Sequence, residues 1–286
     1  MPRHALVSIL AMGLVFLPAA SLADDIKPKA PDTAFSGKLR PDILGISTES
    51  NAESAHAIFD SQFKGRTDAK TDIQRQKLGN GGTSYVAALN FSLPAGPKQN
   101  GEMLSTSFSS PASANRAYYV ARNLTFAQDQ QPSKADMIKE VMGKYGVPTI
   151  VGDQHLYYIY RKGSIMSVGG KYKEASALDA IDKPLDPRAA VKLNGDTVRG
   201  SCVAVVKRAQ AKAKDPTAML TEAKGANCDG VLSVQLVPGT PGDRVGIAQF
   251  TLLDVKQLIS AAAIDGAALA AGPNDGAMPK GGAPKL

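Results

Sequence analysis

Two histidines in the body of the chain are the first candidates for acid–base chemistry. His155 stands two residues after Asp153, and Ser164 and Ser167 follow it. Aspartate, histidine and serine can form a nucleophilic triad when a fold brings them together. The chain lacks the Gly-x-Ser-x-Gly turn that presents such a serine in many hydrolases. His56, in a predicted helix, is interpreted as a surface or boundary residue. A hydrolase whose site is assembled only by the fold remains an alternative.

The sequence contains no motif typical of a metal, calcium or nucleotide site. The His-Glu-x-x-His pattern, the calcium-binding loop and the Walker phosphate loop are all absent. Gly79-Asn80-Gly81-Gly82 is rich in glycine, but it lacks the spacing and the following helix of a dinucleotide loop. Asn-Gly between two strand-like runs is typical of a β-hairpin. We therefore predict no metal site and no cofactor.

A run of tyrosines is the strongest candidate for a binding surface. Strand alternation across His155–Arg161 (HLYYIYR) puts Tyr158 and Tyr160 on one face and Tyr157 on the other. Tyr158, Tyr160 and the adjacent Arg161 combine aromatic rings with a cation, which is common at recognition surfaces. Packing of these rings in a core is the alternative, and both interpretations stay open from the sequence.

The two cysteines, Cys202 and Cys228, are predicted to form a disulfide, because an even pair close in sequence usually does so in an oxidising compartment. Such a bridge stabilises by about 3–4 kcal/mol on the chain-entropy account. The spacing fits neither a redox Cys-x-x-Cys pair nor a zinc site. A structural role is therefore expected.

The beginning of the chain has the features of a cleavable export signal. Arg3 precedes an apolar run, Ala5–Leu17, that is too short for a stable membrane span. Small residues precede the expected cleavage between Ala23 and Asp24, and no cysteine near it could carry a lipid. A short membrane anchor is the alternative. We expect a periplasmic or secreted protein, with no transmembrane segment in the mature chain.

The mature chain is basic. Removing Arg3 with the signal changes the formal net charge from +7 to +6. A basic surface suits anionic partners, and for an exported protein these are an envelope protein or an anionic polymer rather than nucleic acid. A solvated surface that only aids solubility is the alternative.

Composition divides the chain into segments. We predict a signal peptide (1–23), a flexible leader (24–37), an N-terminal α+β domain (38–168), a polar linker (169–190), a C-terminal α+β unit (191–263) and a disordered tail (264–286).

The pattern of elements predicts an α+β fold, with mostly antiparallel sheets packed against about four helices and a disulfide in the C-terminal part. Helices are expected after a Ser50–Glu53 capping box, after Ser133, after Asp215 and over Asp254–Ala263. Strands are expected on both sides of the Gly79–Gly82 turn, over Glu102–Ser109 and Arg116–Phe126, over His155–Arg161 and Thr197–Val206, and near Val231–Val237 and Arg244–Leu252.

The stretch from Met137 to Arg161 resembles the SmpA/OmlA-type module of small outer-membrane lipoproteins. In that family a helix ends in a Gly-x-Pro turn that leads into an aromatic strand; here the matching residues are Gly146-Val147-Pro148 and Leu156–Arg161. Gly45-Ile46-Ser47 also resembles the Gly-Met-Thr opening of the module. The chain departs from the family by lacking tryptophan and a lipidation cysteine, and by placing several strands between the two helices. The resemblance implies a scaffold that binds other envelope proteins.

Together these features predict an exported, non-enzymatic binding or scaffold module in the bacterial periplasm or envelope. The alternative is a periplasmic hydrolase.

Overall fold

The structure of the protein, a computed structural model, describes residues 27–35, 40–79, 82, 84–151, 154–166, 190–193, 196–199, 216–226 and 228–271, together with Cys202, Val203, Val205, Val206 and Ala209. The predicted signal peptide, its cleavage site at Ala23 and Asp24, and nearly all of the predicted linker lie outside these residues.

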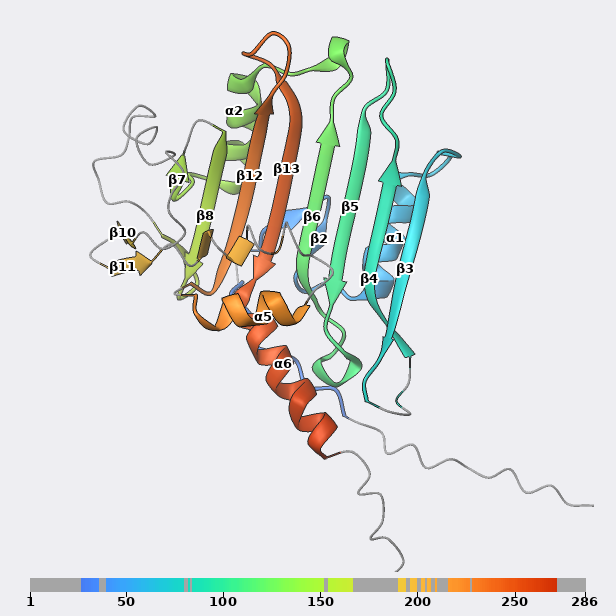
Figure 1. Cartoon of the computed structure of the whole chain (residues 1–286), viewed down its shortest axis with the longest axis vertical. Helices are drawn as coiled ribbons and strands as arrows, with labels where there is room; N and C mark the ends of the chain where they lie inside the picture. The colour runs from blue at the N-terminus through green and yellow to red at the C-terminus, as the bar shows by residue number, and fades with distance from the viewer. Residues whose placement is uncertain are drawn as a thin grey trace, which may run out of the picture.

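A nine-stranded sheet forms the centre of the molecule (Figure 1). Its order is β3 (Lys70–Lys77), β4 (Ser84–Leu93), β5 (Gly101–Phe108), β6 (Ala117–Thr125), β13 (Val245–Asp254), β12 (Gly230–Pro238), β8 (His155–Arg161) and β7 (Ile150–Val151), with β9 (Ser164–Ile165) also on β8. Two small hairpins join β1 (Asp42–Ile43) to β2 (Ile46–Ser47) and β10 (Ala190–Leu193) to β11 (Asp196–Arg199). Every pairing between these strands is antiparallel.

The sheet does not follow the predicted division into two α+β units. The hairpin β12–β13, from the predicted C-terminal unit, lies between β6 and β8 of the predicted N-terminal domain. Segments 38–168 and 191–263 therefore share one sheet, and the prediction of separate units is wrong in this respect. Local composition could not show a pairing between strands so far apart in sequence.

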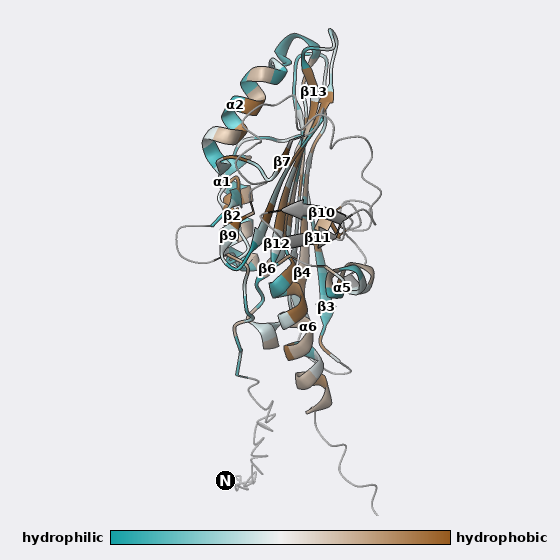
Figure 2. Ribbon diagram, turned by 90° about the vertical axis from the view of Figure 1, so that its left-hand side faces the viewer, coloured by the Kyte–Doolittle hydropathy of each residue, from teal (hydrophilic) through white to brown (hydrophobic). Residues whose placement is uncertain are grey.

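Helices lie on both sides of the sheet, as Figure 2 shows edge-on. Helices α1 (Ala52–Gln62) and α2 (Lys134–Tyr145) cover one face. Helix α5 (Pro216–Lys224) lies on the other face, and α6 (Val255–Ala270) leaves the end of β13 and contacts α5. Two short 3-10 turns, η1 (Pro111–Ser113) and η2 (Gln128–Gln130), join strands and helices. The predicted α+β class and the prediction of about four helices are confirmed.

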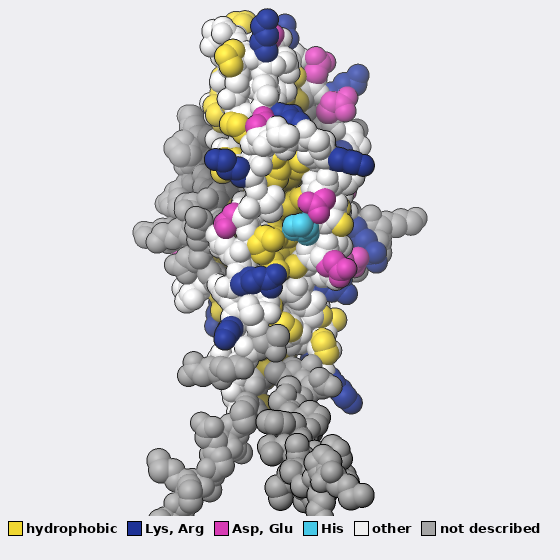
Figure 3. Space-filling view, turned by 90° about the vertical axis from the view of Figure 1, so that its right-hand side faces the viewer, with side chains coloured by type: hydrophobic (Ala, Val, Ile, Leu, Met, Phe, Trp, Pro, Cys, Tyr) yellow, Lys and Arg dark blue, Asp and Glu magenta, His cyan; other side chains and the backbone are white. Residues whose placement is uncertain are grey.

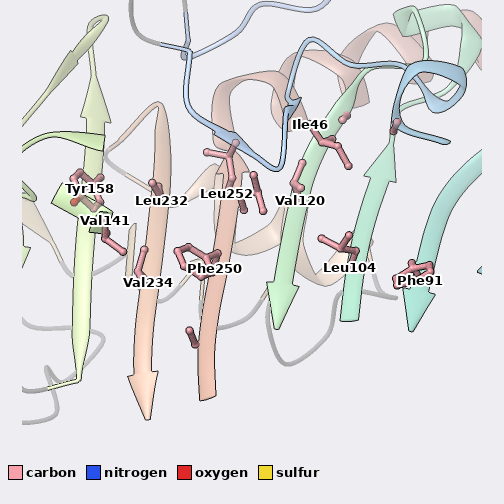
Figure 4. Packing of buried hydrophobic residues seen from close by; sticks show 14 of the residues in the cluster. Ile46, Phe91, Leu104, Val120, Val141, Tyr158, Leu232, Val234, Phe250 and Leu252 are labelled. Carbon is pink, nitrogen blue, oxygen red and sulfur yellow. The ribbon is translucent and has the colours of Figure 1, made fainter. Parts of the chain in front are cut away.

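Each face of the sheet has its own buried cluster. Under α1 and α2, side chains from neighbouring strands project to the same side, among them Phe91, Val120 and Leu232 (Figure 4). On the other face, Tyr157 and Val231 pack with the predicted disulfide between Cys202 and Cys228, which is confirmed. Cys202 lies in a helical stretch, not in the strand expected over Thr197–Val206.

The helix boundaries correct the sequence prediction at two places. The capping box of α1 is formed by Asn51 and Ser54, one residue later than the predicted Ser50 and Glu53. Helix α2 begins, as predicted, after Ser133, whose hydroxyl accepts from the Asp136 N–H. Helix α6 continues through Ala270, so the first residues of the predicted disordered tail are helical.

The last described residues of the predicted flexible leader pack against the sheet, whereas residues 27–30 are exposed. Ala34 and Phe35 are buried, and the Phe35 ring makes an edge contact with Tyr160 at 4.9 Å between centroids. Gly230 permits this approach, because a Cβ atom there would lie 2.7 Å from the Phe35 ring. We call residues Thr33–Phe35 the N-terminal strap.

Asp254 fastens the strap to the end of β13. Its carboxylate is fully buried and accepts hydrogen bonds from the Thr33 hydroxyl, the Ala34 N–H and the Gln257 N–H. The amide of Gln257 in turn donates to the carbonyls of Thr48 and Ala117. Burial raises the pKa of Asp254 to about 6, although the hydrogen bonds to its carboxylate act in the opposite direction and lower the pKa.

This raised pKa makes folding stability depend on pH. Because the native state holds the Asp254 proton more tightly than the unfolded chain, the free energy of unfolding should fall as pH rises from about 4 to about 6.5, by at most about 3 kcal/mol. Asp254→Asn should remove this fall, whereas Asp129→Asn, at an exposed carboxylate, should keep it. Urea unfolding followed by circular dichroism at several pH values measures the change. An unchanged pH profile in Asp254→Asn would contradict the assignment.

Candidate functional site

The predicted tyrosine surface lies inside the protein. Tyr158 is fully buried, and its hydroxyl donates to the Gly146 carbonyl at 3.1 Å. Tyr160 packs against Phe35 and is 2 % exposed. Arg161 is half-buried at the end of β8. The core interpretation of the tyrosines therefore holds, and Tyr158 and Tyr160 present no accessible platform, because β8 is an inner strand that α2 and the N-terminal strap cover.

The distance between His155 and Ser164 excludes Ser164 from the triad that the hydrolase alternative requires. The His155 ring stacks on the Tyr157 ring, with 5.6 Å between centroids. Ser164 pairs with Arg161 at the far end of β8, about 20 Å from His155 at the rise of a strand. Ser164 and His155 therefore cannot share a hydrogen bond. Asp153 and Ser167 lie outside the described residues.

The remaining sequence candidates give no chemical site in the described part of the chain. His56 lies in α1 and pairs with Asp60 of the next turn, with 3.1 Å between Nδ1 and the carboxylate. In the same described residues, no group of three histidine, cysteine or acidic side chains could hold a metal ion.

A groove lies on the α1 side of the sheet. Its volume is about 930 Å³. Its floor contains Leu93, Leu124 and Phe126, and its rim includes Phe63 at the end of α1 and the loop at Lys98. The floor stays open because α1 ends at Gln62 before it reaches this end of the strands. We call it the Arg122 groove, after the charged side chain in its floor.

Arg122 is held by a single partner. Its Nε–H donates to Glu102 at 2.6 Å, and the two side chains are only 21 % and 10 % exposed. Among the described residues this is the one hydrogen bond made by the guanidinium group. A guanidinium group carries five N–H donors, so four remain for water or a ligand in the groove.

The groove has an excess of positive charge. Four cations line it, Lys64, Arg66, Lys98 and Arg122, with two carboxylates, Asp68 and Glu102. Each carboxylate pairs with an arginine, Asp68 with Arg66 at 3.2 Å and Glu102 with Arg122. The Arg66 and Gln99 hydrogen bonds also lower the pKa of Asp68. The described residues offer no ion pair to Lys64 or Lys98, so both add net charge to the rim.

Figure 3 looks onto the β3 side of the molecule, next to this groove. Hydrophobic side chains are exposed along the middle of this side, and lysine and arginine side chains are spread around them. Ile73 of β3 contributes to the exposed apolar surface, with 42 % of the residue accessible. Acidic side chains are also exposed there, so this side carries charges of both signs beside the apolar groups.

The sequence signal for this groove was weak. Glu102 and Arg122 are twenty residues apart on neighbouring strands, and the pairing of Glu102 with Leu124 and of Leu104 with Arg122 places them diagonally. Alternation shows that both side chains point to the helix-covered face, where a charge is unusual. The position of these two charged side chains on the helix-covered face was the only feature of the sequence that indicated the groove.

The Arg122–Glu102 pair should be energetically coupled. Arg122→Met leaves a nearly buried carboxylate without its partner, and we expect a loss of about 1–3 kcal/mol in the free energy of unfolding. The double variant Arg122→Met/Glu102→Gln should recover part of this loss. A double-mutant cycle by urea denaturation measures the coupling. Strictly additive effects would show that the two charges do not interact.

Comparisons with known proteins give no relative: no family model, no curated protein and no solved structure matches the chain. The resemblance of the Met137–Arg161 stretch to envelope lipoprotein modules therefore stays a prediction.

Proposed function

We propose that this protein is an exported, non-enzymatic binding module of the bacterial envelope, and that the Arg122 groove is its ligand site. The observation that carries the proposal is Arg122 itself. Its guanidinium group is four-fifths buried and fixed on one side by Glu102, while its remaining donors line an open groove. A fixed guanidinium group with free donors is suited to a carboxylate or phosphate.

The compartment is supported by the covalent structure. A disulfide between Cys202 and Cys228 fits an oxidising location outside the cytoplasm. No helix in the described residues is long and apolar enough to cross a membrane. The features of the first residues, read as an export signal, agree with such a location.

The groove favours an anion with an apolar portion. Lys64 and Lys98 attract negative charge at the rim, and Arg122 can bind an anionic group at the floor. Leu93, Leu124 and Phe126 offer apolar surface beside it. A ligand that combines an anionic head and a hydrocarbon body satisfies both sets of groups. Carboxylated or phosphorylated amphiphiles and polymers of the envelope have this chemistry.

Dodecyl phosphate, used as a monomer, tests this proposal by titration calorimetry against neutral dodecyl maltoside. We expect saturable binding of the phosphate alone. Lys64→Gln/Lys98→Gln should weaken it about tenfold, which corresponds to about 1.4 kcal/mol. The matched control is Lys139→Gln/Lys224→Gln, which removes the same charge at exposed positions away from the groove and should change binding less than threefold.

Equal weakening in the two double variants would show that only the overall basic charge attracts the anion. Absence of binding, or equal binding of the neutral amphiphile, would remove the Arg122 groove as an anion site.

A further inference from the structure

A second cavity lies on the opposite face of the sheet, under α5 and α6. It has a volume of about 220 Å³, about the space of seven water molecules in the liquid. Three different elements meet there: Tyr85 of β4, Tyr118 of β6 and Asp265 of α6. Leu258 of α6 and Leu220 of α5 add apolar surface. We call it the Asp265 pocket.

The position of Asp265 is fixed by η1. Its Oδ1 accepts hydrogen bonds from the hydroxyls of Ser110 and Ser113, both at 2.7 Å. Its Oδ2 receives a weaker bond from the Ser110 N–H at 3.3 Å. These bonds alone would only fasten α6 to the end of β5. Anchoring of α6 does not explain why a cavity with two tyrosines in its wall lies beside these bonds.

The pocket carries a negative charge that the described residues of its wall do not neutralise. No lysine, arginine or histidine is among its lining residues, and the described part of the chain offers Asp265 no ion pair. Burial, and to a smaller extent the negative charge of Asp265, raise the pKa of Tyr85. A cation in the cavity would be attracted by the carboxylate and by the faces of the aromatic rings.

The hydrogen bonds of Asp265 also indicate which kind of cation fits. The two serine hydroxyls already occupy Oδ1, and Oδ2 has one weak donor. A primary ammonium group needs three acceptors for its three N–H donors. Gln74, Gln76 and Thr217 in the wall could supply some of them, but Asp265, which carries the charge, has little acceptor capacity left. An alkylated ammonium needs only charge and apolar contact, which the carboxylate, the tyrosines and the leucines provide.

We propose that the Asp265 pocket binds a small alkylated ammonium group, such as a trimethylammonium head. The site is separate from the Arg122 groove, since the two open on opposite faces of the sheet, and the proposal does not depend on the function proposed for that groove.

Three small alcohols that share a two-carbon chain and differ in the head group test the proposal on the purified, disulfide-bonded protein at constant ionic strength. Choline carries the trimethylammonium group, 3,3-dimethylbutan-1-ol has the same shape without charge, and ethanolamine carries a primary ammonium. We expect saturable binding of choline, measured by titration with two-dimensional NMR, at least tenfold tighter than binding of the other two. The shifted resonances should belong to residues of β4, β6 and α6.

Two variants and a control separate the role of the pocket from folding. Asp265→Asn keeps an acceptor for the two serines and should weaken choline binding at least tenfold. Tyr85→Leu removes a half-buried ring and should weaken it severalfold. Asp243→Asn removes one exposed charge elsewhere and should leave binding unchanged. Thermal unfolding of each variant shows whether it is folded.

Equal binding of choline and the neutral alcohol would overturn the proposal, as would no choline binding to the native protein. Unchanged affinity in both folded pocket variants would also do so. Tighter binding of ethanolamine than of choline would assign the pocket to primary amines instead.

Discussion

The buried carboxylate of Asp254 is the constraint on which the arrangement of this protein depends. It stands where the last strand of the sheet becomes α6, and it binds the N-terminal strap through Thr33 and Ala34. Gln257, capped by the same carboxylate, reaches the carbonyls of Thr48 and Ala117. One acidic group therefore joins the beginning, middle and end of the described chain. It does so without a cation, so hydrogen bonds alone must compensate for its burial.

The path of α6, which begins after its N-cap residue Asp254, also determines where the surface of the protein is hollow. Helix α6 runs from β13 to the end of β5, where Asp265 meets Ser110 and Ser113, and the space left beneath it is the Asp265 pocket. On the other face, α1 stops before it covers the end of the sheet and leaves the Arg122 groove. The two hollows differ in charge because Lys64 and Lys98 give the Arg122 groove an excess of positive charge, whereas Asp265 is the charged side chain among the described residues that line its pocket. Within the described residues the helical layers leave both hollows open.

Local features of the fold could be predicted from the sequence, and long-range ones could not. Ser133 and Gly146 act within a few residues, and β3 pairs with the next strand, β4, so these features follow from local side-chain and backbone chemistry. The insertion of β12 and β13 between β6 and β8 depends on pairing of strands that lie far apart in the sequence, such as Gly230 with Tyr160 and Leu253 with Tyr119, and no periodicity indicates it. Whether the tyrosines of β8 lie in the core or on a binding surface stayed open from the sequence, because alternation identifies faces but not what covers them. The Arg122 groove and the Asp265 pocket required the fold itself, since their residues come from separate elements.

The place of the β12–β13 hairpin in the sheet has a consequence for the order of events as the chain folds. Strands β6 and β8 are both present before residues 230–254 are synthesised or delivered, yet each needs that segment as its neighbour. Until it arrives, each has an unpaired edge that another chain could join. Pairing of strands so far apart in the sequence is slow, because the chain between them loses conformational entropy before the new contacts stabilise the sheet. The sheet therefore cannot be completed until residues 230–254 have paired with β6 and β8.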